Sequence, residues 1–161
     1  MTRLRLMKLM YIANREMFKK HGRPILIARA SALQKGPVLS EVYDLVNGGR
    51  SDEAAWGRYV RNVGPREVQL IEDPSADSLS PAELEILNNV TDDFAQYDDW
   101  EIVELTHGFE EWRGNYPDPE ANTSHPIETE DILQAVGMGE FAEKIVRDLQ
   151  DEEDFERIFA S

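Results

Sequence analysis

The stretch T-R-L-R-L-M-K-L-M-Y-I-A-N-R-E-M-F-K-K-H-G (residues 2–22) decides the fold of this chain. Thr2 is a good N-cap, and His21-Gly22 followed by Pro24 is a typical helix end. Between them, apolar residues recur at helical spacing on two faces. One stripe consists of Leu6, Leu9, Met10, Ala13 and Met17, and the other of Leu4, Met7, Tyr11 and Phe18. A helix with two apolar faces needs neighbours on both, so we predict a central helix over residues 2–20.

Start and stop signals predict that much of the remaining chain is helical. Gly36-Pro37 is interpreted as a helix start, because Pro at the first helical position loses no hydrogen bond. Gly48-Gly49 is interpreted as the end of that helix. Two spacings of the form Ser/Asp-x-x-Glu predict capping boxes. The helices that they start begin at Ser80 and Asp98, and two more are expected over residues 129–136 and 140–159.

The other segments are expected to be extended or irregular. Residues 57–71 predict a β-hairpin, and residues 25–33 an extended segment or short strand. Residues 113–126 contain Gly, three Pro, two Asn and a Ser, so we expect a loop. A length of 161 residues is ordinary for one domain. The expected fold is therefore mainly α: a compact helical bundle with a small β-hairpin, in a single domain spanning residues 1–161.

Charge is distributed unevenly along the chain. Residues 1–66 contain thirteen Lys/Arg and five Asp/Glu, a net charge of +8, whereas residues 67–161 contain four and twenty-seven, a net charge of −23. A total of −15 repels nucleic-acid phosphate and favours basic partners. The same charge can also serve only to keep the surface solvated. We expect no direct DNA binding, and we expect any protein partner to be basic.

Composition also indicates a compartment. No apolar run approaches the ~18 residues that a membrane span needs, and we expect no signal peptide. The chain contains no cysteine. This excludes disulfides and thiol nucleophiles, and it is compatible with a reducing cytoplasm. We expect a cytoplasmic protein with no membrane partner.

Known motifs for catalysis or cofactor binding do not occur. G-x-S-x-G, the phosphate loop, H-E-x-x-H and D-x-D-x-D-G are all missing. Gly137-Met138-Gly139 lacks the third glycine and the preceding strand of a dinucleotide fingerprint. His107 precedes a helix-ending glycine, where a protonated imidazole suits the negative end of a helix. We therefore expect no enzyme activity, no metal and no cofactor.

Four segments, taken in order, are informative together. They are M-K-L-M-Y-I-A-N-R (residues 7–15), H-G-R-P-I (21–25), A-L-Q-K-G-P-V-L-S-E-V-Y (32–43) and E-L-T-H (104–107). This set resembles the Panacea domain of SocA-like antitoxins, which also occurs in phage-associated GepA-like proteins. The resemblance continues into I-E-T-E-D-I-L-Q-A-V-G (127–137). It implies the antitoxin of a type II toxin–antitoxin system, which neutralises a cognate protein toxin by direct binding.

Three alternatives stay open. The resemblance also allows an adaptor that delivers its toxin to a host protease. The carboxylate-rich residues 67–161 suit a phage or mobile-element inhibitor that mimics DNA and blocks a nucleic-acid-binding host protein. A hydrolase built on His107 and nearby carboxylates has the least support. A small toxin-like reading frame beside the gene would favour the antitoxin.

The segments that carry the resemblance also predict a toxin-binding face. Lys35-Gly36-Pro37 lies where free helix N–H groups can hold an anion or a partner's carboxylate. Tyr43 lies off the apolar face of the next helix, at the border of the core. Taken singly, Trp56, Trp100 and Trp112 are each expected in the core, but Trp112 has charged neighbours at a loop margin and is also a candidate interface anchor. The expected face consists of Lys35, Gly36, Pro37, Tyr43, His107 and Trp112.

Overall fold

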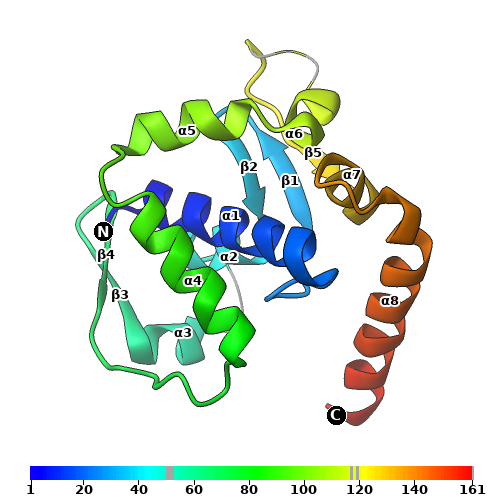
Figure 1. Cartoon of the computed structure of the whole chain (residues 1–161). Helices are drawn as coiled ribbons and strands as arrows, with labels where there is room; N and C mark the ends of the chain where they lie inside the picture. The colour runs from blue at the N-terminus through cyan, green and yellow to red at the C-terminus, as the bar shows by residue number, and fades with distance from the viewer. Residues whose placement is uncertain (50–52, 117, 119, 161) are drawn as a thin grey trace.

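The computed structural model describes residues 1–49, 53–116, 118 and 120–160. Its fold is mainly α-helical, with two small antiparallel sheets (Figure 1). The helices are α1 (Arg3–His21), α2 (Ser40–Asn47), α3 (Glu53–Tyr59), α4 (Pro81–Asp93), α5 (Asp99–His107), α6 (Glu110–Asn115), α7 (Thr129–Ala135), the 3-10 turn η1 (Gly139–Phe141) and α8 (Ala142–Phe159). The strands are β1 (Ala30–Leu33), β2 (Gly36–Leu39), β3 (Val60–Val63), β4 (Glu67–Leu70) and β5 (His125–Ile127). None of the helices in the described part of the chain is long and apolar enough to cross a membrane.

Helix α1 is the central helix that the sequence predicts (Figure 1). The Thr2 hydroxyl accepts a hydrogen bond from the Arg5 backbone N–H at 3.0 Å, and Gly22 ends the helix with a φ of 67°. One apolar cluster joins Met7, Tyr11 and Phe18 to the three-stranded sheet, α2, α6, α7 and α8. A second cluster joins Leu9, Ile12, Ala13 and Met17 to Ile86 and Val90 of α4 and Ile102 of α5. Both faces of α1 are therefore buried, as its two stripes indicate.

Gly36-Pro37 forms part of a strand, so the predicted helix start at this position is wrong. Gly36–Leu39 is β2, which pairs antiparallel with β1 across the two-residue turn Gln34-Lys35, and α2 begins only at Ser40. The sheet order is β2-β1-β5, so β2 lies at an edge, where Pro37 can lack an N–H without breaking an interior ladder. Gly36 adopts a φ of 93°, a left-handed conformation that favours glycine.

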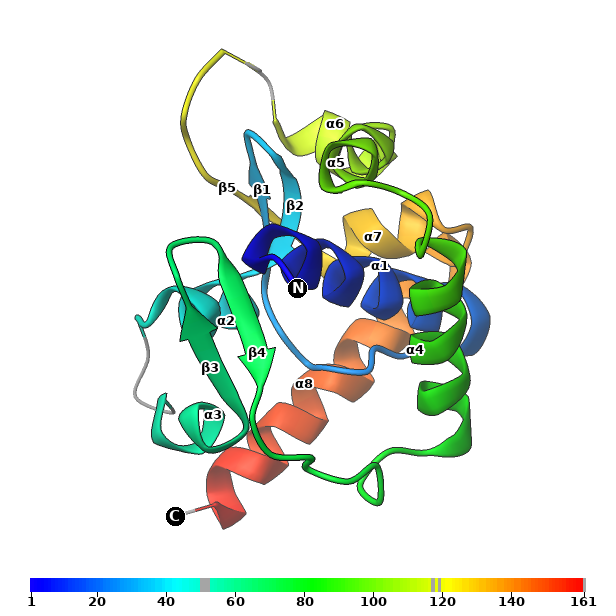
Figure 2. The ribbon, with the colours of Figure 1, turned by 90° about the vertical axis from the view of Figure 1, so that its left-hand side faces the viewer.

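The predicted hairpin is present as β3 and β4, although residues 57–59 belong to α3. Two backbone hydrogen bonds join this hairpin to the start of the chain. The Arg3 N–H donates to Arg66 O at 2.8 Å, and the Val68 N–H donates to Met1 O at 2.9 Å. Figure 2 shows the result: the N-terminal end of α1 lies beside the β3–β4 turn and below the β1–β2 turn.

Both predicted capping boxes form, and they start α4 and α5. The predicted loop over residues 113–126 is partly wrong, because Glu110–Asn115 is helix α6 and His125–Ile127 is β5. The predicted helix over residues 129–136 is α7, and most of the one over residues 140–159 is α8.

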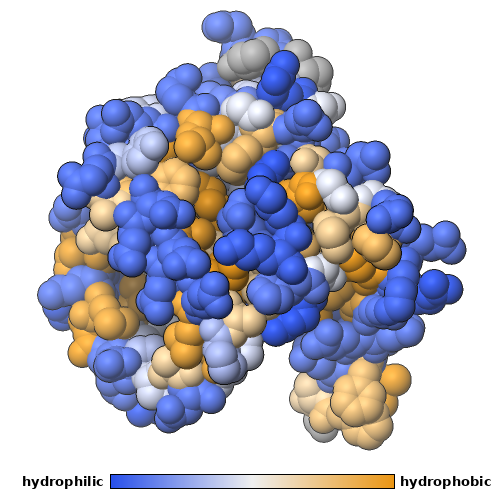
Figure 3. All heavy atoms as spheres, viewed as in Figure 1, coloured by the Kyte–Doolittle hydropathy of each residue, from blue (hydrophilic) through white to orange (hydrophobic). Residues whose placement is uncertain are grey.

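Helix α8 runs down one side of the molecule to the C-terminus (Figure 1). Its last turns expose Phe155 and Phe159, whose rings lie 4.5 Å apart. Figure 3 shows an apolar group at the C-terminal tip of α8, next to hydrophilic residues. The apolar residues of α8 that pack on the core are Ile145, Val146 and Leu149 in its first half, whereas Phe155 and Phe159 are exposed.

Candidate functional site

The buried polar side chains of α1 hold other segments in place. The Asn14 side-chain oxygen accepts hydrogen bonds from the backbone N–H groups of Ile25 and Leu26, both at 2.8 Å. The Asn14 amide donates back to Leu26 O at 3.0 Å. This side chain therefore satisfies the backbone of the segment that leads from α1 to the sheet.

A buried ion pair joins α1 to α6. The Glu111 carboxylate is 3% exposed, and it accepts hydrogen bonds from Arg15 Nε at 2.7 Å and the Tyr11 hydroxyl at 3.1 Å. Burial, together with the negative charge of Glu111, raises the pKa of the Tyr11 hydroxyl well above its usual value. The Arg15 guanidinium also lies 4.0 Å from the centre of the Phe109 ring. These contacts fix the position of α6.

Lys8 is the other buried polar residue of α1 besides Asn14, and it supports the β1–β2 hairpin. Its side chain is 1% exposed, and its ammonium donates to Pro37 O at 2.7 Å. A Cβ placed on Gly36 would lie 3.1 Å from Lys8 Nζ and 2.4 Å from Thr106 Oγ1. The hairpin thus lies directly on Lys8 and Thr106. Burial lowers the pKa of the Lys8 ammonium to about 7.

We expect the pH dependence of stability to reveal this burial. In the unfolded chain Lys8 keeps its ordinary high pKa, so above neutral pH the unfolded state binds more protons than the folded state. The free energy of unfolding should therefore rise with pH, by about 2 kcal/mol between about pH 7 and about pH 9 relative to Lys8→Met. Urea unfolding of both proteins across this range measures the difference. If the free energies of unfolding of the two proteins changed with pH in parallel, burial would not lower the pKa of Lys8.

His107 and Trp112 brace the β1–β2 hairpin from the other side. The Trp112 indole N–H donates to Leu33 O at 2.8 Å, and His107 Nε2 lies 3.1 Å from Gln34 O. The His107 and Trp112 rings stack with their centroids 4.2 Å apart, and the Trp112 ring stacks in turn on Tyr116 at 5.2 Å. Trp112 is only 7% exposed. It is a core residue, which corrects its predicted place on an exposed face.

The structure thus divides the predicted site into two groups. His107 and Trp112 do meet the hairpin that contains Lys35, Gly36 and Pro37, but Gly36, Pro37 and Trp112 are buried. The exposed members are Lys35 and Tyr43, and they line one pocket together. Gly36, Pro37 and Trp112 therefore belong to the packed interior of the hairpin and its support, and they do not form its outer surface.

We call this hollow the basic–aromatic pocket and define it by Arg3, Lys35, Tyr43, Arg66 and Trp100. It has a volume of about 600 Å³ and is lined by residues of α1, α2, α5 and the two hairpin turns, elements whose arrangement can be followed in Figure 2. Tyr43 is 39% and Trp100 58% exposed. Lys35 Nζ lies 5.3 Å from the centre of the Trp100 ring, a cation–π contact. The prediction that Trp100 is a core residue is therefore wrong.

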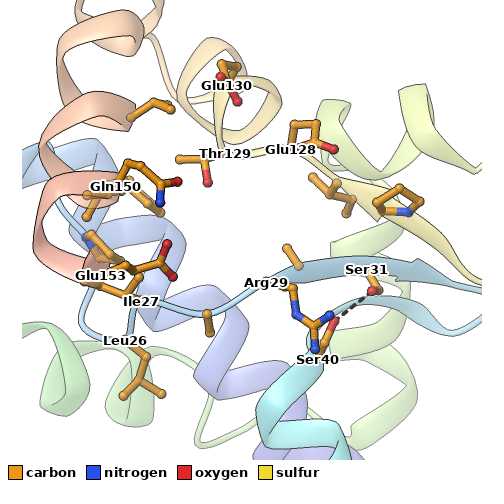
Figure 4. Close-up of a pocket in the computed structure, with 18 of the residues that line it drawn as sticks. Leu26, Ile27, Arg29, Ser31, Ser40, Glu128, Thr129, Glu130, Gln150 and Glu153 are labelled. Carbon is orange, nitrogen blue, oxygen red and sulfur yellow. Dashed lines mark hydrogen bonds between the residues drawn. The ribbon is translucent and has the colours of Figure 1, made fainter. Parts of the chain in front are cut away.

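A second hollow lies between α8 and the segment before β1 (Figure 4). We call it the acidic groove and define it by Leu26, Arg29, Glu128, Glu130 and Glu153; its volume is about 520 Å³. Arg29 is paired with Glu41 at 2.9 Å, so its charge is already neutralised. The remaining charged side chains of the groove are carboxylates. A basic group suits this groove, in keeping with the negative charge of residues 67–161.

Comparison with known proteins identifies a family. The model of the SocA-like antitoxin family, Panacea domain, matches residues 6–113, which is more than half of the chain. No curated protein and no solved structure is significantly similar to the chain. The matched residues contain Lys35, Tyr43, Arg66 and Trp100, whereas α7 and α8 lie outside them.

Proposed function

The chain belongs to the SocA-like antitoxins with a Panacea domain, and on that premise we propose that it neutralises a cognate protein toxin by binding it directly. The toxin–antitoxin pair would be of type II, in which both partners are proteins. We propose the basic–aromatic pocket as the main contact. The observation that carries this choice is that Tyr43 and Trp100, which both belong to the matched residues, are exposed beside one pocket.

Exposed aromatic side chains are the usual anchors of protein interfaces. Tyr and Trp contribute most of the binding energy when a partner covers them, because they bury a large apolar area and keep a polar atom for a hydrogen bond. Tyr43 is presented by α2 and Trp100 by the first turn of α5. Both helices are fixed to the core, so the two rings are held in place before a partner arrives.

The charge of the chain supports a basic toxin. Residues 67–161 carry −23, and the acidic groove and the end of α8 present part of this charge beside exposed apolar side chains. A basic partner would be drawn to this side by long-range attraction, which accelerates association. The exposed Phe155 and Phe159 would then add apolar contact at the end of α8.

Co-expression with the protein encoded by the neighbouring reading frame tests this function. We expect the chain to restore growth and to co-purify with that protein. Tyr43→Ala should weaken the complex by about thirtyfold, which corresponds to the ~2 kcal/mol typical of a central aromatic anchor. Titration calorimetry on purified proteins measures the change.

Two controls accompany that measurement. Tyr97→Ala removes a tyrosine of similar exposure, 42%, that lies outside the pocket, and Glu152→Ala removes one carboxylate of α8. Both should bind almost as the wild type does. A folded Tyr43→Ala protein with normal affinity would move the recognition surface elsewhere, first to α8. Restored growth with no complex, together with an enzymatic activity, would reject the antitoxin role.

A further inference from the structure

We infer that the basic–aromatic pocket takes a carboxylate from an acidic segment of the toxin, although the chain as a whole is strongly acidic. This inference rests on the proposed function and names the chemistry that its site recognises. It also differs from what net charge alone indicates, because a chain of −15 favours basic groups. The charged side chains that line the pocket, and not the net charge of the chain, decide which ligand charge the pocket attracts.

Cations from three separate segments converge on the pocket. Arg3 comes from the first turn of α1, Lys35 from the β1–β2 turn and Arg66 from the β3–β4 turn. Asp99 also lines the pocket, but its carboxylate already accepts a hydrogen bond from Thr2 and lies 3.6 Å from the Arg5 guanidinium. The pocket therefore has a net positive charge inside a negative protein.

These cations are not neutralised within the described residues. Arg15, Arg23, Arg29 and Arg58 each have a carboxylate partner at 3.1 Å or less. In the same part of the chain Arg3, Lys35 and Arg66 form no ion pair with a carboxylate.

Arg3 shows the lack of an acceptor most clearly. Its Nε is buried and has no hydrogen-bond partner in the described structure, and its terminal nitrogen reaches only Gly64 O, at 3.5 Å. A buried donor without an acceptor is costly, and the one hydrogen bond of the terminal nitrogens is long, so the Arg3 guanidinium is not satisfied by acceptors of the described structure.

The aromatic side chains select a protein group over nucleic acid. A carboxylate on a peptide segment brings apolar neighbours that can cover Tyr43 and Trp100, and removal of water then strengthens its attraction to Lys35 and Arg66. Nucleic acid carries a phosphate charge at every nucleotide and would be repelled by the surrounding −15 surface. An otherwise basic toxin with one acidic segment suits the charge of the pocket and the charge of the acidic groove.

Charge reversal in the pocket tests the inference. The double variant Lys35→Glu with Arg66→Glu changes two exposed side chains, and the chain's backbone hydrogen bonds do not depend on them. We expect it to bind the protein encoded by the neighbouring reading frame at least about tenfold more weakly than the wild type. Lys19→Glu with Lys20→Glu is the matched control, because it makes the same change in net charge at the opposite end of α1. Circular dichroism confirms that each variant is folded.

The outcomes separate this inference from the proposed function. Absence of any complex with the wild type would reject the function itself. A normal complex that is equally tight with the reversed pocket, or that is weakened equally by both double variants, would overturn the inference alone. Titration with inorganic phosphate checks the other source of an anion. Saturable phosphate binding that the reversed pocket loses, with toxin affinity unchanged, would also overturn it in favour of a small anion.

Discussion

Trp112→Ala is expected to lower the free energy of unfolding by about 3–5 kcal/mol, the usual cost of removing a buried aromatic side chain. Trp112 is 7% exposed, its N–H donates to Leu33 O, and its ring lies between His107 and Tyr116. The substitution therefore leaves a cavity and removes the donor that braces β1. At a typical domain stability of about 5–15 kcal/mol, a loss of this size unfolds a large share of molecules on mild heating.

Trp100→Ala is the matched control for that measurement. It makes the same substitution at a residue that is 58% exposed, so we expect a change in stability within about 1 kcal/mol. Chemical unfolding of both variants measures the two changes. A Trp112→Ala protein as stable as the wild type would mean that Trp112 is not a core residue, and equal large losses would mean that Trp100 also supports the fold.

Gly36→Ala is expected to cost about 3 kcal/mol, for two separable reasons. A φ of 93° places an L side chain in the left-handed region, which costs about 1–2 kcal/mol. The new Cβ would also lie 2.4 Å from Thr106 Oγ1, so the hairpin must shift away from Thr106 and Lys8, at a cost typical of overpacking, about 1–3 kcal/mol. Thermal or urea unfolding measures the total.

Gly64→Ala isolates the first of these two costs. Gly64 has a φ of 78°, but a Cβ there meets nothing within 4 Å. We expect it to lose only the backbone part, about 1–2 kcal/mol. If both variants lost the same free energy of unfolding, the close packing of Gly36 on Thr106 of α5 would make no contribution to the cost of Gly36→Ala.

The local signals in the sequence were enough to predict the helices with strong start and stop residues. Thr2 and Gly22 bound α1, and the capping boxes at Ser80 and Asp98 start α4 and α5. Each of these capping interactions joins residues that lie within four positions of one another, so the local sequence is enough to predict it. The two stripes of α1 also predicted its central place, because apolar spacing reports burial directly.

The errors occur where distant residues decide the local structure. The Gly36-Pro37 sequence is typical of a helix start, but pairing with β1 and the hydrogen bond from Lys8 hold it in a strand. The last three residues of helix α6 lie in the stretch whose composition predicts a loop, and the pair of Arg15 and Glu111 holds this helix to α1. Neither contact has a signal in the local sequence.

The candidate site was predicted in part for the same reason. Lys35 and Tyr43 belong to one continuous motif, and their exposure follows from a hairpin turn and a helix border. Arg3, Arg66 and Trp100 reach the pocket from three other segments, and only the fold brings them there. The apolar pattern of α5 did not indicate that Trp100 is exposed, because an apolar residue in the first turn of this helix can lie on its buried face or on its exposed face.

If this chain neutralises a toxin by binding it, the toxin must lose its activity in proportion to the complex formed. The most direct measurement is calorimetric titration of the purified chain into the protein encoded by the neighbouring reading frame, with the activity of that protein followed in the same samples. We predict saturable binding, with loss of toxic activity that tracks occupancy for the wild type and shifts to about thirtyfold higher concentration for Tyr43→Ala. Loss of toxic activity with no measurable complex, or a complex that leaves the activity unchanged, would show that the chain does not neutralise the toxin by binding it.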